Sequence, residues 1–246
     1  MNIKKLVWQA AVVATVVILG SCSKDESTPT NTQVIPVQTV VQPTVALGSA
    51  STIAVLAGSA ITSTGATVIT GDMGLSPGTS IGGFPPGILN GTQHINDNIA
   101  TQAKLDLTAA YNDVAGRTST GIVTLSGNIG GLTLTPGIYK STSSLAISSG
   151  DLTFDAKGNA NAVFILQMAS TLTTTSGRKV ILSGGALAAN IYWQVGSSAT
   201  FGTTSVFKGT VLAMQSITFE TGATLDGKAL ARTGAVVMAG NTIVKQ

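Results

Sequence analysis

The amino-acid sequence predicts an all-β solenoid, a triangular parallel β-helix, because of a repeat and of the composition. In the repeat, threonines follow a large apolar residue, at Leu172, Phe201, Phe219 and, more loosely, Met238. Phe219 lies 18 residues after Phe201 and 19 before Met238, which suits one coil of three strands of about six residues joined by corners. The step of 29 residues from Leu172 to Phe201 implies an extra loop in that coil.

The composition favours the same fold. Charged residues make up 9% of the chain and aromatic residues 4%, so aliphatic side chains must fill a narrow interior. The chain also contains 35 threonines and 29 glycines. We expect the four large apolar residues of the repeat to stack inward and the threonines to form an outward file. Because coils of a β-helix stack at about 4.8 Å, such a file is a flat array of one residue type.

Residues 46–244 carry a series of motifs that resemble a known family. In chain order they are residues 47–50 (LGSA), 54–59 (AVLAGS), 70–78 (TGDMGLSPG), 83–87 (GFPPG), 109–113 (AAYND), 132–139 (LTLTPGIY), 192–200 (YWQVGSSAT) and 227–232 (GKALAR). Together they resemble the bacterial and fungal ice-binding proteins of the β-solenoid type. The resemblance implies a discontinuous right-handed β-helix with one long α-helix packed alongside, and ice as the ligand.

Residues 1–21 are predicted to be a lipoprotein signal peptide. Lys4 and Lys5 precede an apolar stretch over residues 6–19, which is too short to span a membrane and has no stop-transfer signal after it. Residues 19–22 (LGSC) resemble a bacterial lipoprotein box, so Cys22 is the expected lipid attachment site. Cys22 is the single cysteine, and the mature chain can therefore form no disulfide.

Residues 22–45 are predicted to be a lipidated tether, and residues 46–246 the ice-binding domain. Residues 23–26 (SKDE) resemble the acidic export signal of surface-displayed lipoproteins, and residues 27–45 contain three prolines and few charges. The expected location is extracytoplasmic: an outer-membrane lipoprotein exposed at the surface, or a secreted protein. The lipid is then the membrane contact.

One segment, from Asn96 to Gly116, is predicted to be helical. Apolar residues recur at spacings of three or four, namely Ile99, Ala103, Leu107, Ala110 and Val114, and polar residues such as Lys104 lie between them. Asn96 is the expected N-cap and Gly116 the expected end. Elsewhere, short apolar runs at residues 162–167, 190–195 and 209–213 predict strands. The end coils of a solenoid expose unpaired strand edges that promote aggregation, so some cap is expected. We place part of this cap over residues 82–97.

The sequence offers little for catalysis or metal binding, and no enzyme activity, cofactor or metal is expected. His94 is the single histidine, and its position predicts a hydrogen-bonded role near the start of the helix. Most carboxylates lie beside glycines or turns, where side chains bond to local backbone. Asp72 and Asp226 are conceivable calcium ligands, but no aspartate-rich loop repeats.

The candidate ice-binding residues are threonines. The unit Thr64-Gly65-Ala66-Thr67 recurs as residues 221–224, and Thr-rich units of this kind hold the ice contacts of the resembling family. Thr174, Thr203 and Thr221 align across the repeats. We therefore predict a face that contains Thr64, Thr67, Thr174, Thr203, Thr221 and Thr224, although threonine is also simply a good strand former.

The predicted function is ice binding by a monomer. A net charge of +3 without a Lys/Arg stripe does not indicate nucleic acid as a partner. The alternative is a surface-attached adhesin or polysaccharide-binding solenoid. Such sites usually present exposed aromatic rings, whereas Trp193 lies in an apolar strand. A polysaccharide lyase is a third reading, but it would need clustered basic and acidic residues.

Overall fold

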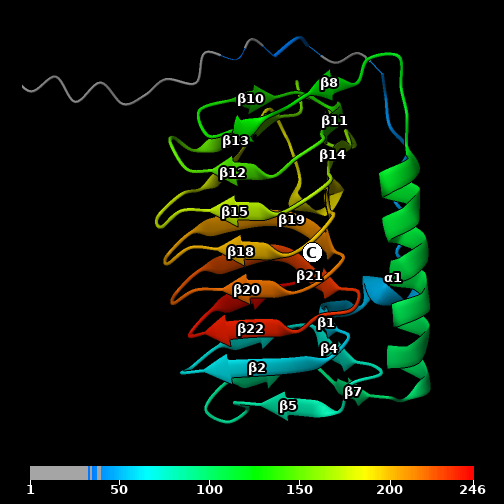
Figure 1. Ribbon diagram of the computed structural model, residues 1–246, viewed down its shortest axis with the longest axis vertical. Coiled ribbons are helices and arrows are strands. Elements are labelled where there is room, and N and C mark those ends of the chain that lie inside the picture. The colour runs from blue at the N-terminus through cyan, green and yellow to red at the C-terminus, as the bar shows by residue number, and fades with distance from the viewer. Residues whose placement is uncertain (1–32, 34, 38–39) are drawn as a thin grey trace, which may run out of the picture.

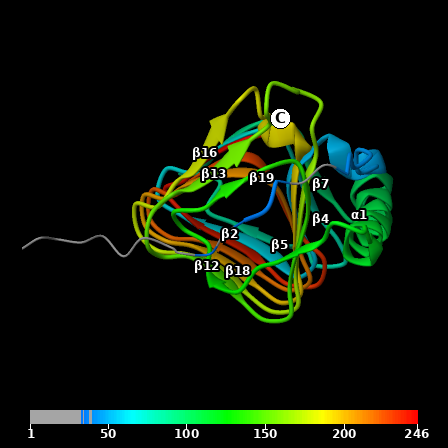
Figure 2. The same cartoon turned by 90° about the horizontal axis from the view of Figure 1, so that it is seen from above.

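Parallel strands stack into a triangular solenoid, with one long helix along one side (Figures 1 and 2). This arrangement was obtained as a computed structural model, which describes residues 33, 35–37 and 40–246. The predicted all-β solenoid with one packed helix is confirmed. We name its three sides the helix face, the front face, which lies toward the viewer in Figure 1, and the back face.

The helix face is the longest stack of strands. Its order is β8 (Val123–Thr124), β11 (Gly137–Ser141), β14 (Phe164–Met168), β17 (Ile191–Val195), the second halves of β19 (Val206–Ala213) and β21 (Thr224–Ala231), then β1 (Ile53–Ala57), β4 (Asp72–Leu75) and β7 (Gln93–Ile95). These strands include the three segments that were predicted from short apolar runs.

The front face is one sheet of eight short strands. Its order is β9 (Gly127–Asn128), β12 (Leu145–Ile147), β15 (Leu172–Thr174), β18 (Ala199–Phe201), β20 (Ile217–Phe219), β22 (Val236–Ala239), β2 (Ala60–Thr64) and β5 (Ser80–Gly82). Most of these strands alternate between buried and less buried residues, as expected for a sheet with one face on the core.

The back face begins with a separate sheet of β10 (Thr133–Leu134), β13 (Leu152–Asp155) and β16 (Val180–Ser183). It continues through the first halves of β19 and β21 to β23 (Thr242–Val244), β3 (Val68–Thr70) and β6 (Ile88–Asn90). Gly209 and Gly227, with φ of 106° and 149°, bend β19 and β21 so that each strand serves two faces.

The stacking order does not follow the chain order. The chain forms two coils from β1 to β6, then ends that stack with β7, and α1 (Asn98–Gly116) carries it to the opposite end of the solenoid. From β8 it winds back until β21, β22 and β23 pair with β1, β2 and β3. We call the contact between these two parts of the chain the seam. The predicted discontinuity is thereby confirmed.

Aromatic rings fill the centre of the coils. Phe201 and Phe219 stack with centroids 4.8 Å apart, and Phe207 contacts both Phe201 and Trp193. Leu172, Phe201, Phe219 and Met238 are at most 1% exposed, which confirms their predicted inward direction. Trp193 is fully buried, and its indole N–H donates to the carbonyl of Lys208 at 3.0 Å.

The helix begins and packs slightly differently from the prediction. Its N-cap is Asp97, whose carboxylate accepts the N–H of Ala100 at 2.8 Å, whereas the predicted cap Asn96 bonds to the carbonyls of Pro77 and Gly78. Ile99, expected in the apolar stripe, is 46% exposed, and Ala100 is buried instead. The remaining stripe residues and the end at Gly116 are confirmed.

Different segments of the chain lie at the two ends of the solenoid. Strands β5, β6 and β7 lie at one end, where residues 82–97 were expected to form part of a cap. At the other end, the side chain of Gln33 donates to the carbonyl of Thr124. Farther along the chain, Gln42 is buried, and Val45 is buried in the cluster beneath the helix. The packed part of the chain thus begins before residue 46.

Two short 3₁₀ helices, η1 (Gly48–Ser51) and η2 (Ala188–Asn190), complete the elements. The predicted signal segment and Cys22 lie outside the described residues. Within those residues, none of the helices combines the length and the apolar character that crossing a membrane requires.

Candidate functional site

The front face carries a straight file of small outward side chains. Strand pairing puts one residue of each strand directly over the next, and the threonines of this file alternate with buried neighbours. We call it the central file: Asn128, Ala146, Thr173, Thr200, Thr218, Val237, Thr62 and Gly82. Side chains of one file lie about 4.8 Å apart because that is the spacing of paired strands.

A second file runs beside the central file. We call it the flanking file, and it consists of the residues two positions earlier: Ser144, Thr171, Ser198, Ser216, Ala235, Ala60 and Ser80. Its hydroxyls bond from coil to coil: Thr171 Oγ1 donates to Ser144 Oγ at 2.8 Å, and Ser216 Oγ accepts the N–H of Ala235 at 3.2 Å. Residues two apart in a strand are separated by roughly 6.7 Å, so the two files form a regular grid.

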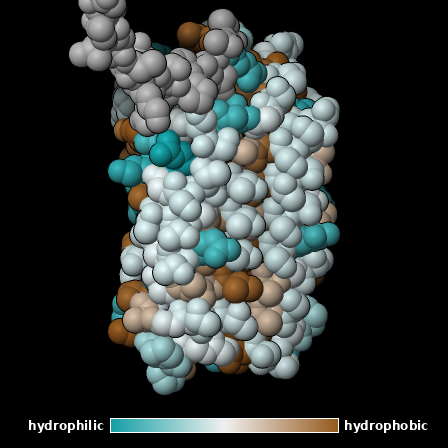
Figure 3. Space-filling model, turned by 60° about the vertical axis from the view of Figure 1, so that its left-hand side comes forward, coloured by the Kyte–Doolittle hydropathy of each residue, from teal (hydrophilic) through white to brown (hydrophobic). Residues whose placement is uncertain are grey.

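The grid carries no charge. None of the residues of the two files is ionisable, and Glu220 at the end of β20 supplies a carboxylate at the rim. The back face, in contrast, has an ion pair between Lys208 and Asp226 at 3.1 Å. Figure 3 brings the left-hand side of Figure 1 forward, and most of the surface in view is pale, near the middle of the hydropathy scale.

The structure places four of the six predicted threonines at or near the surface. Thr64 is exposed at the end of β2, where it pairs with Ala239 on the front face. Thr203 and Thr221 are exposed in the turns that follow β18 and β20, and these turns are adjacent because the N–H of Thr204 donates to the carbonyl of Thr221. Thr224 is half-buried and lies on the back face, in register with Val206 and Thr242.

The expectation that Thr67 and Thr174 lie on an exposed face is wrong. Thr67 is 0% exposed and Thr174 is 3% exposed. Thr174 pairs with Phe201, so the repeats align at a step of 27 residues and not 29. The correct register therefore moves Thr174 from the outward threonines to the inward file of Phe201 and Phe219.

Sequence reasoning missed the central file itself. Thr173, Thr200 and Thr218 each lie between two buried residues, as in Ile217-Thr218-Phe219. Strict alternation of apolar residues and threonine was therefore the signal that could have found them. The aligned threonines in the following turns drew attention away from it.

The titratable groups serve local structure. Nδ1 of His94 lies 2.7 Å from Oδ2 of Asp97, which confirms the hydrogen-bonded role near the helix start. The N–H of Ala100, followed by His94, lowers the pKa of Asp97. Among the described residues, no group of three or more His, Cys, Asp and Glu side chains is arranged to hold a metal ion.

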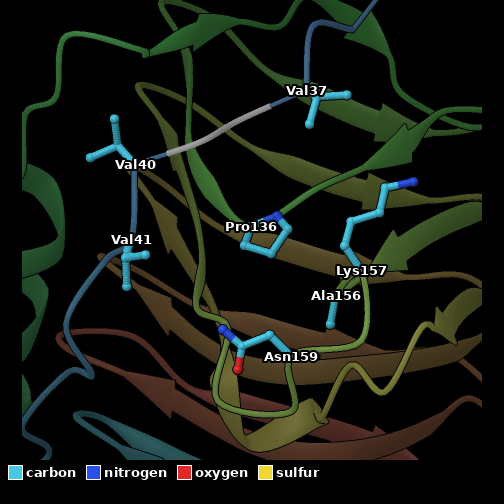
Figure 4. A pocket seen from close by; sticks show the side chains of 7 residues that line it. All are labelled: Val37, Val40, Val41, Pro136, Ala156, Lys157 and Asn159. Carbon is cyan, nitrogen blue, oxygen red and sulfur yellow. The ribbon is translucent and has the colours of Figure 1, made fainter.

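A pocket of about 250 Å³ lies between the N-terminal segment and one end of the solenoid (Figure 4). Its lining is mainly apolar: Val37, Val40, Val41, Pro136, Ala156, Lys157 and Asn159. The ammonium of Lys157 is paired with Asp155 at 2.8 Å. The pocket therefore gathers no set of acid, base and nucleophile.

Proteins with similar sequences are known from bacteria. The chain is 46% identical over 202 residues to an ice-binding protein of Nostoc sp. (strain HG1), and the alignment covers 80% of this chain and 72% of the relative. It is 37% identical over 215 residues to an ice-binding protein of Flavobacterium frigoris (strain PS1), and that alignment covers 80% of this chain and 75% of the relative.

Solved structures have the same fold. An ice-binding protein from an Antarctic biological consortium is 73% identical, with a TM-score of 0.86 over 86% of this chain and 96% of the other. One from the Antarctic ascomycete Antarctomyces psychrotrophicus is 42% identical, with a TM-score of 0.78 over 83% and 99%. The sequence also matches the family described as Ice-binding-like over residues 55–244. The chain therefore belongs to the Ice-binding-like family.

Proposed function

We propose that this protein binds ice crystals through the front face, and that it shapes ice and inhibits its growth and recrystallisation. The observation that carries the proposal is the uncharged grid of the central and flanking files, which the strand register keeps in line along the solenoid. Relatives and structural neighbours named as ice-binding proteins support the same function.

The chemistry of the central file suits ordered water. Each outward threonine presents a methyl group and a hydroxyl on a stiff β-branched side chain. Methyl groups shape the first layer of water, and hydroxyls hold it by hydrogen bonds. The spacings of about 4.8 Å and 6.7 Å are of the same order as repeats of the ice lattice. Charged groups would impose their own hydration, so their absence from both files favours this ligand.

Adsorption explains how such a face would act. A rigid grid engages many water positions at once, and little conformational freedom is lost on binding. Protein molecules held at fixed points force the ice between them to grow as curved fronts, which lowers the local freezing point. The same adsorption slows the growth of large grains at the expense of small ones.

The alternatives find less support. A polysaccharide-binding solenoid or adhesin would be expected to expose aromatic rings, whereas Trp193 lies in the core and the two files contain no aromatic residue. We propose no catalytic activity, since His94 and Asp97 are engaged at the helix start. We propose that the protein acts as a monomer without nucleic acid.

The exposed turn residues and the N-terminal anchor complete the proposal. Thr64, Thr203 and Thr221 would extend the ice contact at the rim of the front face.

Cys22 would carry lipid and hold the domain at the outer surface of the cell, as residues 19–22 indicate. Fractionation of the Cys22→Ala variant tests the anchor.

A matched pair of variants tests the ice-binding face. Thr218→Tyr places a bulky ring in the middle of the central file, and Thr242→Tyr makes the same change at an exposed position of the back face. We expect Thr218→Tyr to abolish most thermal hysteresis and recrystallisation inhibition, while Thr242→Tyr keeps both. Each change should alter stability by less than about 0.5 kcal/mol. Equal activity in the two folded variants would show that ice contacts lie elsewhere.

A further inference from the structure

We infer that Asn241 and Thr67 are positioning residues, which hold the two halves of the front face in one plane at the seam. The inference rests on the proposed function, because it concerns the flatness of the same face. At the seam, β2 adds to β22 and β3 adds to β23, although these strands lie at opposite ends of the chain. No connecting loop joins β22 to β2 or β23 to β3, so the two parts are held together there by non-covalent contacts.

Four inward residues occupy equivalent places at the corner between the front and back faces. The strand register stacks Ser205, Ala223, Asn241 and Thr67 in successive coils, each directly before a back-face strand. All four are at most 1% exposed. In the coil above the seam this place holds a simple alanine, whereas the two coils that meet at the seam hold an asparagine and a threonine.

Asn241 bonds the turn of its own coil to the turn of the coil above. Its amide nitrogen donates to the carbonyls of Glu220 at 2.8 Å and Ala223 at 2.9 Å, and its amide oxygen accepts the N–H of Ala239. The two carbonyls belong to the turn that follows β20 on the front face. One buried side chain therefore bonds three backbone groups, of which the carbonyl of Glu220 also accepts the N–H of Ala223. Buried polar groups are costly to leave without partners.

Thr67 continues this network across the seam. Its hydroxyl oxygen accepts the backbone N–H of Asn241 at 3.1 Å and the hydroxyl of Ser63 at 2.7 Å. Ser63 is an inward residue of β2, between Thr62 and Thr64 on the front face. The network thus links the turn after β20, the turn after β22 and strand β2.

The consequence concerns the alignment of the central file. Thr218, Val237 and Thr62 lie in register across the seam, and ice contact needs all three in one plane. Hydrogen bonds of defined length and direction specify a unique arrangement better than apolar packing, which tolerates small shifts. A shift of a fraction of an ångström between β22 and β2 would divide the grid into two smaller faces.

Three variants test the inference. Thr67→Val keeps shape and volume but removes the acceptor, Thr67→Ser restores the acceptor, and Asn241→Ala installs the residue that already occupies the equivalent position 223. Ser205→Ala is the matched control. It removes a buried hydroxyl from the same stack, and this hydroxyl has no hydrogen-bond partner among the described residues. Thr218→Tyr reports on the front face itself.

Thermal hysteresis is measured near 0 °C, together with circular dichroism to confirm that each variant is folded at that temperature. We expect Thr67→Val and Asn241→Ala to fall to about half of the parent activity or less, because preorganisation of the face is lost. Thr67→Ser and Ser205→Ala should keep parent activity. If Thr67→Val fails to fold, the thermal hysteresis of Asn241→Ala is compared with that of Ser205→Ala, and a loss confined to Asn241→Ala supports the positioning role.

The possible failures are distinguishable. If folded Thr67→Val and Asn241→Ala keep parent activity while Thr218→Tyr loses it, the proposed positioning role of Thr67 and Asn241 is rejected. The ice-binding face is then still supported. Parent activity in Thr218→Tyr would reject the front face itself. Equal loss in Thr67→Val, Thr67→Ser and Ser205→Ala would mean that any change in this stack disturbs the fold, and would also overturn the inference.

Discussion

Thr174 stabilises the corner at the end of β15. Its buried hydroxyl oxygen accepts the N–H of Gly202 from the next coil at 3.0 Å. Thr174→Val should lower the free energy of unfolding by about 1 kcal/mol. This loss is at the low end for a buried hydrogen bond, because the N–H of Gly202 also donates to the carbonyl of Thr174 and keeps that partner in the variant. Urea unfolding measures the change. The control Thr173→Val alters an outward neighbour and should be nearly neutral, so equal losses would contradict the assignment.

Local alternation indicates which side chains share one face of a strand, and the register between coils indicates which residues share a file. Phe201 and Phe219 were placed correctly from their size and spacing, whereas the polar Thr174 was placed outward, although it lies two residues after the inward Leu172 and so on the same face of the strand. Its burial follows from the pairing with Phe201, a contact between coils. A shift of two residues keeps the in-and-out alternation but changes which residues share a file. The alignment at 29 residues left the inward core in place but matched Thr174 with Thr203, a turn residue, and so missed the outward file.

Lys104 is a half-buried cation on the solenoid side of the helix, not one of its outer polar residues. Its ammonium donates to the carbonyls of Ala231, at 2.7 Å, and Arg232. Burial, followed by the charge of Arg232, lowers the pKa of Lys104 from 10.5 to about 8. The folded protein therefore binds this proton more weakly than the unfolded chain does, and stability should rise as pH increases from about 8 to 10.5.

Urea unfolding at pH values across this window measures the effect. Lys104→Met keeps the length of the side chain without the charge, and its stability should rise less over the same window than that of the parent. Burial also lowers the pKa of Lys228, so part of the rise will remain in the variant. An identical pH dependence in the two proteins would rule out the contribution of Lys104.

At the scale of elements, α1 depends on the cap at its start. Asp97 accepts the N–H of Ala100 and holds His94, and these contacts lower the pKa of its carboxyl group. Asp97→Ala should lower the melting temperature at neutral pH, whereas Asp97→Asn, which keeps an acceptor, should lower it less. The contribution of Asp97 is present above the ordinary carboxyl pKa and is lost as pH falls below it. The difference between parent and Asp97→Ala should therefore shrink in acid, and a constant difference would contradict this role.

The helix was predictable to within two residues because its apolar spacing is a property of one continuous segment. The choice between Asn96 and Asp97 as cap depended on a tertiary contact, the bonds from Asn96 to the carbonyls of Pro77 and Gly78. The short front-face strands gave weaker signals, since three residues of alternation are common in any threonine-rich chain. Their pairing, and not their local sequence, defines the face.

At the scale of the whole molecule, α1 allows the chain to build the stack in an order that differs from the order of the sequence. The two N-terminal coils are completed first along the chain, and the last coil closes against them at the seam. No local sequence feature of β22 indicates that β2 is its partner. Resemblance to a known family implied this discontinuity, whereas periodicity alone would have suggested a stack in chain order.

The position of the N-terminal segment bears on how the molecule would be displayed. Gln33 bonds to Thr124 at the β8 end of the solenoid, and the guanidinium of Arg117 donates to the carbonyls of Pro43 and Thr44 at the same end. Lipid on Cys22 would therefore hold this end toward the membrane, because the residues between Cys22 and Gln33 span at most about 40 Å. The front face would then run outward from the cell.

Cys22→Ala should remove the attachment and release the domain into the soluble fraction with its ice activity intact, because Cys22 belongs to neither file of the front face. Metabolic labelling with a fatty acid should mark the parent chain and not the variant. Ser27→Ala, a change in the same segment, should leave labelling and membrane fractionation as in the parent. Co-fractionation of Cys22→Ala with membranes, together with an unlabelled parent, would reject the lipid anchor while leaving the ice-binding face to be judged by Thr218→Tyr.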